Sequence, residues 1–151
     1  MARGPREWNP GKTYQKILWK WTARASDILA KVARPLASDG LDVQTLRSEE
    51  WDGSITWQFE IHGRVGKPLK EEGWVYVTIA FHPTEDAPKI HVASLSLMEG
   101  GGGSIKEFLL TKAPIDVTNE TQMERAFEKA NELVPKVIEV LLSHDWEPSE
   151  D

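Results

Sequence analysis

Residues 54–65 read SITWQFEIHGRV, and the alternation in this stretch decides the fold. Side chains two residues apart share one face of an extended strand. The apolar set (Ile55, Trp57, Phe59 and Ile61) would therefore lie opposite the polar set (Thr56, Gln58, Glu60 and His62). This pattern predicts a half-buried strand. The preceding pair Asp52 and Gly53 favours a two-residue hairpin, because glycine adopts a positive φ at little cost.

Further strands are expected on both sides of this one. Leu41, Val43 and Leu46 indicate a short strand before the hairpin. Residues 74–81, WVYVTIAF, are apolar on both faces, which is typical of a strand in the middle of a sheet. Residues 90–98 and 104–110 are candidate strands on either side of the glycines at 100–103. Short connections between consecutive strands favour an antiparallel meander, since parallel pairs need long crossovers.

Two long amphipathic helices are predicted near the ends of the chain. Apolar residues recur in helical steps from Tyr14 to Val32, and residues 123–141 show the same periodicity. Pro35 is expected to end or bend the first helix at residue 34. Burying both apolar stripes on one face of the sheet predicts a two-layer α+β fold. Its sheet would be a four- or five-stranded antiparallel meander flanked by long N- and C-terminal helices.

The chain of 151 residues has the length of a single domain. We expect a flexible arm over residues 1–11, one α+β domain over 12–146, and a frayed acidic tail over 147–151. The absence of cysteine excludes disulfides and thiolate metal sites, and it is compatible with a reducing cytoplasm. The charged start lacks a secretory apolar region, and no apolar run approaches the roughly 18 residues of a membrane span. The sequence therefore predicts a cytoplasmic protein without a membrane span.

Motifs that would indicate catalysis or a cofactor are missing from the sequence. The glycine run does not continue into the Lys-Ser or Lys-Thr of a phosphate-binding loop, and a strand-like segment follows where a helix is needed. We expect it to form a hairpin tip. The four histidines lack metal-ligand spacing. These features predict a protein that is not an enzyme and that holds neither a metal nor a cofactor.

Charge and tryptophan are distributed unevenly along the chain. Residues 1–34 carry a formal charge of +6 and the remainder −12, within a net charge of −6. Basic residues recur every fourth position on the first helix, at Lys12, Lys16, Lys20 and Arg24. Large aromatic groups outside a core often anchor interfaces. The candidate partner contacts are Lys16, Trp19, Lys20 and Arg24 on the helix, and Trp51 with the glycine tip (Gly101 and Gly102) as a second patch.

These features favour a non-enzymatic protein-binding module: an adaptor, a chaperone-like protein, or an inhibitor or immunity protein. Its partner would be another protein, and a homodimer through a helix or a strand edge is compatible with it. A nucleic-acid or anion binder, using the basic face of the first helix, is the first alternative, although the −12 remainder disfavours a polyanion. A small-ligand-binding or hydrolytic domain is the second, with His62, His82 or His91 lining a cavity between sheet and helices. The basic face could also be solvated or paired with the acidic second helix.

Overall fold

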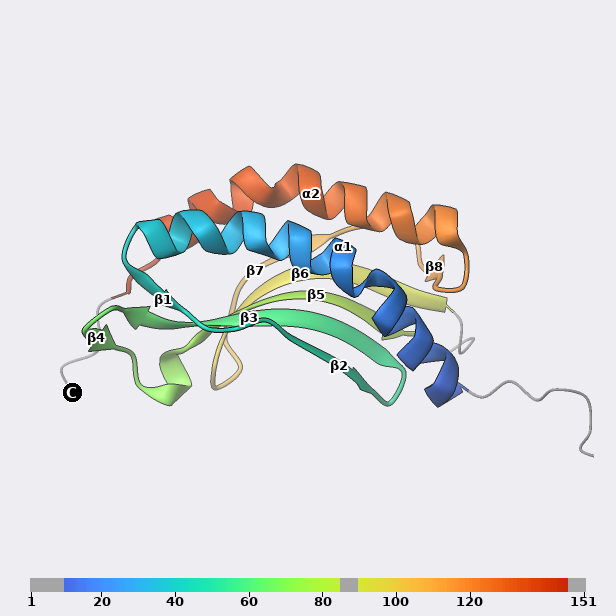
Figure 1. The fold of residues 1–151 in the computed structure, drawn as a ribbon, viewed down its shortest axis with the longest axis horizontal. Coiled ribbons are helices and arrows are strands. Elements are labelled where there is room, and N and C mark those ends of the chain that lie inside the picture. The colour runs from blue at the N-terminus through green and yellow to red at the C-terminus, as the bar shows by residue number, and fades with distance from the viewer. Residues whose placement is uncertain (1–9, 85–89, 147–151) are drawn as a thin grey trace, which may run out of the picture.

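The structure, a computed structural model, describes residues 10–84 and 90–146, and it has the predicted order of helix, antiparallel strands and helix. Figure 1 shows both helices lying along the same side of one sheet. The helices are α1 (Pro10–Ser38) and α2 (Glu120–Leu142), and a 3₁₀ turn, η1, spans Glu71–Gly73. The strands are β1 (Leu41–Val43), β2 (Arg47–Trp51), β3 (Ser54–Arg64), β4 (Lys67–Pro68), β5 (Val75–Pro83), β6 (Ile90–Glu99), β7 (Ser104–Leu109) and β8 (Ile115–Asp116). The two-layer α+β architecture is therefore confirmed.

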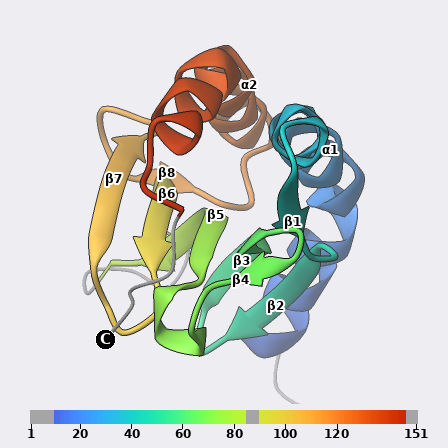
Figure 2. The ribbon, with the colours of Figure 1, turned by 90° about the vertical axis from the view of Figure 1, so that its left-hand side faces the viewer.

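All strand pairs within the described ranges are antiparallel, as the short connections predicted. The main path through the sheet is β1-β3-β5-β6-β7, with β2 and β4 also paired to β3 and β8 paired to β6. The sequence indicated one short strand before the hairpin, whereas the structure has two, β1 and β2, which pair with successive parts of β3. Strands β3 and β5 occupy the middle of the sheet, and β7 lies at one end of the path. Figure 2 shows this order across the sheet beneath the two helices.

The predicted two-residue hairpin joins β2 to β3. Asp52 and Gly53 have φ angles of 51° and 84°, so both central residues are in the left-handed region that this kind of turn requires. Trp51 and Ser54 face each other across the turn. The turn therefore fixes the register that sends Ile55 and Trp57 to the helix side of the sheet, where both are fully buried.

The core lies between the sheet and the helices and is centred on aromatic rings. Phe127 of α2 stacks on Trp21 of α1 with ring centroids 5.2 Å apart, and it contacts Trp57 and Phe81 of the sheet at 5.6 Å each. The indole N–H of the buried Trp57 donates to Thr22 Oγ1 over 3.0 Å. These contacts hold both helices against the sheet, in the layer where the sequence allowed a ligand cavity.

The first helix differs from its prediction at both ends. It begins at Pro10, where proline is tolerated because the N–H groups of the first turn have no helical acceptor. It also continues through Pro35 to Ser38, so of the two outcomes expected at residue 34, an end or a bend, the helix does not end there. Leu36 is fully buried on the same apolar stripe, and Asp39 N donates to Pro35 O over 3.0 Å. Pro35 has no N–H, so the last turn lacks one helical hydrogen bond, and burial of Leu36 stabilises this turn instead.

The second helix has defined signals at both ends. Asn119 is its N-cap, and the Asn119 side chain accepts a hydrogen bond from Gln122 N over 3.0 Å. Beyond the other end, Trp146 is only 2% exposed, and its indole N–H donates to Leu141 O over 2.7 Å. Residue 146 thus belongs to the folded domain, while the predicted arm (apart from the start of α1) and the acidic tail lie outside the described residues.

Tyr14 of α1 is buried against the β2–β3 hairpin and gives a test of this packing. Its ring lies 5.2 Å from that of His91, and burial, with a smaller contribution from the Glu50 carboxylate, raises the pKa of Tyr14 above its ordinary 10.0. A raised pKa means that the unfolded chain loses the proton first. The contribution of Tyr14 to stability is therefore complete below about pH 10 and is lost as the pH rises towards the folded-state pKa.

We accordingly expect Tyr14→Phe to be less sensitive to alkali than the unchanged protein. Urea unfolding measured between about pH 8 and pH 11.5 should show the free-energy difference between the two proteins shifting in favour of the variant above pH 10. A difference that stays constant over this range would show that the Tyr14 hydroxyl is not desolvated in the folded state.

Candidate functional site

The basic row predicted on the first helix is partly engaged by the second helix. Lys20 Nζ lies 3.3 Å from Glu120 Oε2, and the Arg24 guanidinium lies 3.0 Å from Glu124 Oε1. The two acidic residues lie four positions apart on α2, which is the same spacing that separates Lys20 and Arg24 on α1. Lys16 is exposed and lines a surface pocket of about 200 Å³ with Lys20 and Glu120. At Lys20 and Arg24, the positive charge of the first segment of the chain thus contacts negative charge of the second helix.

The other predicted contacts do not come together. Trp19 on α1 is 69% exposed and Trp51 on β2 is 75% exposed, as expected of candidate anchors. However, Trp51 flanks the β2–β3 turn, whereas Gly101 and Gly102 form the β6–β7 turn at the opposite end of the sheet. The register shows this separation, because β3 begins opposite the end of β5 and β6 ends opposite its start. Trp51 and the glycine tip therefore cannot form one compact patch within this molecule.

The glycine run turns a hairpin, as expected. Gly101 and Gly102 have φ angles of 92° and 100°, and Glu99 N donates to Gly103 O over 2.7 Å. Gly100 N donates to Trp74 O over 2.7 Å, and a Cβ on Gly100 would meet Glu71 O at 2.9 Å. The glycines are thus needed for a tight turn and for a close approach to η1.

Three of the histidines lie in separate environments. His91 is fully buried on the helix side and donates through Nε2 to Gly53 O over 2.8 Å. His82 is exposed, with Nδ1 3.1 Å from Ser54 Oγ. His62 lies near the other end of β3. Across residues 10–84 and 90–146, no group of three or more His, Asp or Glu side chains is arranged to hold a metal ion.

The face of the sheet turned away from the helices, called the open face below, has both polar and large apolar side chains. Both helices lie on the opposite side of the sheet (Figures 1 and 2). Strand alternation and register bring to the open face Arg47, Glu49 and Trp51 of β2, the polar set of β3, Tyr76, Thr78 and His82 of β5, Val92 and Met98 of β6, and Leu109 of β7. Trp51, Val92, Met98 and Leu109 are 75%, 37%, 40% and 57% exposed.

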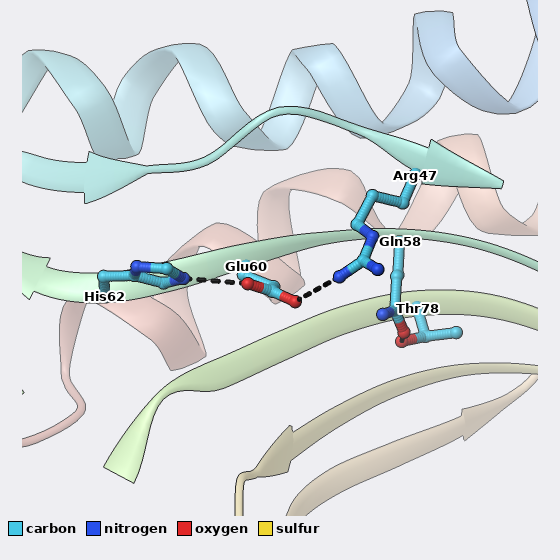
Figure 3. Close-up of polar contacts among 5 residues, drawn as sticks. All are labelled: Arg47, Gln58, Glu60, His62 and Thr78. Carbon is cyan, nitrogen blue, oxygen red and sulfur yellow. Dashed lines mark hydrogen bonds and ion pairs between the residues drawn. The ribbon is translucent and has the colours of Figure 1, made fainter. Parts of the chain in front are cut away.

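Glu60 is the one carboxylate on this face whose side chain is nearly buried among the described residues, with 11% of the side chain exposed. His62 Nε2 lies 2.8 Å from Glu60 Oε2 and, since a carboxylate only accepts, donates to it. Arg47 donates to Oε1 over 3.3 Å from the neighbouring strand. Figure 3 shows these two side chains reaching the carboxylate from opposite sides. Tyr76 lies directly opposite Glu60 in the β3–β5 register.

Neighbouring side chains hold this arrangement in place. The His62 ring stacks on the Trp74 indole with ring centroids 3.6 Å apart and an interplanar angle of 11°. Trp74, the first residue of the apolar run 74–81, is only half-buried and supports His62. Thr78 Oγ1 donates to Gln58 Oε1 over 3.1 Å, which orients the Gln58 amide beside the carboxylate (Figure 3).

A surface cavity of about 540 Å³ opens next to Glu60. It is lined by Arg47, Ser48, Glu49, Thr56, Gln58, Glu60 and Tyr76. The alternation of residues 54–65 correctly placed Thr56, Gln58 and Glu60 on one face of a strand. It could not show which residues of β2 and β5 stand beside them, because strand pairing is decided by contacts distant in sequence. Arg47, Glu49 and Tyr76 were therefore missed.

The fold and this site define a two-layer α+β protein whose antiparallel sheet leaves one face open and concentrates polar groups around a nearly buried carboxylate. No protein-family model matches the chain, and comparisons with curated proteins and with solved structures find no match either. None of the helices in the described part of the chain has the length and apolar character needed to cross a membrane.

Proposed function

We propose that the protein is a non-enzymatic protein-binding module that contacts its partner through the open face of the sheet. The observation that supports this most directly is the composition of that face. A solvated face of an antiparallel sheet is normally polar, yet four large apolar side chains stand exposed here: Trp51, Val92, Met98 and Leu109. Protein interfaces combine such apolar contacts with polar groups in the same way.

Trp51 is the strongest candidate anchor on this surface. It is more exposed than Trp19, and it lies on β2, two residues from Glu49 on the same face. Tryptophan is enriched among the few residues that carry most of the free energy of an interface. The cavity next to Glu60 would then supply the polar contacts that give specificity.

The basic face of α1 has weaker support as the binding surface. Lys20 and Arg24 are within ion-pair distance of Glu120 and Glu124, so a polyanion would have to compete with the protein's own carboxylates. This disfavours the nucleic-acid or anion binder relative to a protein partner. The proposed roles are those of an adaptor, a chaperone-like protein or an inhibitor, acting in the cytoplasm, with a second copy of the chain as a further candidate partner.

Two matched tryptophan substitutions test which surface is used. Trp51→Ala on the sheet and Trp19→Ala on α1 remove the same exposed side chain from opposite layers, and neither opens a hole in the core. Partners retained by the tagged protein in extracts of its source organism would be identified by mass spectrometry and their Kd values measured by calorimetry. We expect Trp51→Ala to weaken the affinity by about 30-fold or more, and Trp19→Ala by less than about twofold. The reverse result would move the interface to α1 and contradict the proposal.

A further inference from the structure

We infer that the cavity beside Glu60 receives a positively charged side chain, arginine or lysine, from an extended segment of the partner protein. This inference rests on the proposed function, since it assigns a chemistry to one part of the open face. Two carboxylates, Glu49 and Glu60, line the cavity against the single permanent cation Arg47. The ionic groups that line the cavity are thus net negative, and His62 contacts Glu60 from outside this lining.

The environment of Glu60 explains why a cation would bind there. A carboxylate with only 11% of its side chain exposed has lost most of its water, so it requires positive or hydrogen-bonding partners. The Gln58 amide oxygen and the aromatic ring of Tyr76 line the same cavity. Both are suited to a guanidinium or ammonium group, the first as a hydrogen-bond acceptor and the second as a face for a cation.

Arg47 occupies the position that a partner's cation would take. Its side chain is 71% exposed and reaches Glu60 Oε1 over 3.3 Å, which is longer than the 3.0 Å between Arg24 and Glu124. The Glu60 end of this pair is nearly buried, but the Arg47 guanidinium is largely solvated, so Arg47 loses little when it leaves the carboxylate for water. The Arg47 guanidinium can therefore swing into solvent and leave Oε1 to an incoming arginine, with Glu49 supplying a second negative charge.

An extended peptide segment fits this surface better than a free small cation. Arg47, Glu49 and Trp51 alternate on the same face of β2, so the cavity and the exposed indole lie along one line of about 13 Å. A segment that places a basic residue at Glu60 would pass over Trp51 within a few residues. A free amino acid or polyamine would use the cavity alone and leave Trp51 uncovered.

The test is an NMR titration of the full-length ¹⁵N-labelled protein with two capped five-residue peptides. One peptide has arginine at its second and fourth positions among serine and threonine, and the other has citrulline, the neutral counterpart of arginine, at the same positions. We expect the arginine peptide to shift the amide signals of residues 47–49, 58–60 and 76 with a saturating curve. The citrulline peptide should bind at least about tenfold more weakly.

Variants test the charge assignment. Glu60→Gln, which keeps the shape of the side chain, should weaken arginine-peptide binding by at least about tenfold. The matched control, Glu107→Gln on β7, removes one carboxylate of the same face outside the cavity and should leave the affinity unchanged. Arg47→Gln should strengthen binding by about two- to fivefold, because it removes the internal competitor. A purely structural Arg47 would give no such gain.

The outcomes separate this inference from the proposed function. Equal binding of the two peptides, or shifts that avoid the cavity, would overturn the inference. The inference would also be overturned if the amide signals of the cavity residues shifted with protein concentration in the absence of peptide. Such shifts would show that a second copy of the chain binds this face. In each case the effect of Trp51→Ala on the partner still decides whether the open face is the interface. Loss of partner binding in Glu60→Gln but not in Glu107→Gln would support both the inference about the cavity and the proposed function of the open face.

Discussion

Phe127→Ala is expected to lower the free energy of unfolding by about 3–5 kcal/mol. Phe127 is fully buried, and its ring contacts Trp21 of α1 as well as Trp57 and Phe81 of the sheet. Removing it leaves a cavity between three rings that are fixed on three different elements, so the surroundings can collapse only partly. Urea unfolding followed by far-UV circular dichroism would measure the loss.

Phe108→Ala is the matched control for this change. Phe108 lies on β7 and is only half-buried, so removing the same side chain there should cost about 1–1.5 kcal/mol. Equal losses in the two variants would mean that the aromatic cluster does not hold the layers together. A Phe127→Ala variant that does not fold at room temperature would agree with the expected effect, and Phe127→Leu would then give a measurable loss of smaller size.

Gly63→Ala is expected to cost about 3–5 kcal/mol, the second large effect. Gly63 lies at the end of β3 with a φ of +120°, which side chains rarely adopt. A Cβ there would meet Lys67 O at 2.7 Å and Leu69 N at 2.8 Å, and both atoms belong to the backbone. The chain segment that includes β4 would have to move, breaking the 2.7 Å hydrogen bond from Leu69 N to His62 O.

Gly66→Ala separates the two causes of that loss. Gly66 also has a positive φ, +84°, but a Cβ at this position has no other atom within 4 Å. Its cost should be the conformational strain alone, about 1–2 kcal/mol. If thermal unfolding showed the same loss for both variants, the close approach of β4 to Gly63 would contribute nothing. A larger loss for Gly63→Ala would also predict a changed ring environment for the adjacent His62, visible in its imidazole NMR signals.

The basic segment of the chain shows how a charge pattern can serve the fold. The sequence separates a positive segment, residues 1–34, from a negative remainder, and this pattern equally suits an external anion or an internal partner. The structure places Glu120 and Glu124 against Lys20 and Arg24. Each of these partly exposed pairs contributes little to stability, but together they favour one relative placement of the helices. Of the four predicted helix contacts, Lys16, Trp19 and Lys20 remain exposed and Arg24 is half-buried.

The elements of this fold follow from local patterns. The alternation of residues 54–65, the helical spacing from Tyr14 and the Asp-Gly turn each depend on neighbours a few residues away, and all three were predicted correctly. The sequence left open whether α1 ends or only bends at Pro35, and the structure shows that it continues, because burial of Leu36 outweighs the local preference of proline to end a helix.

The candidate site could be predicted only in part. The sequence by itself determined that Thr56, Gln58, Glu60 and His62 share one polar face, since successive side chains of a strand point to opposite sides. Only the tertiary structure decided that Glu60 is nearly buried, because Arg47 and Tyr76 come from other strands and stand beside it through the register of the sheet. Register is set by long-range pairing and by the helices that cover the other face, and this is why the charged cavity is a property of the folded chain.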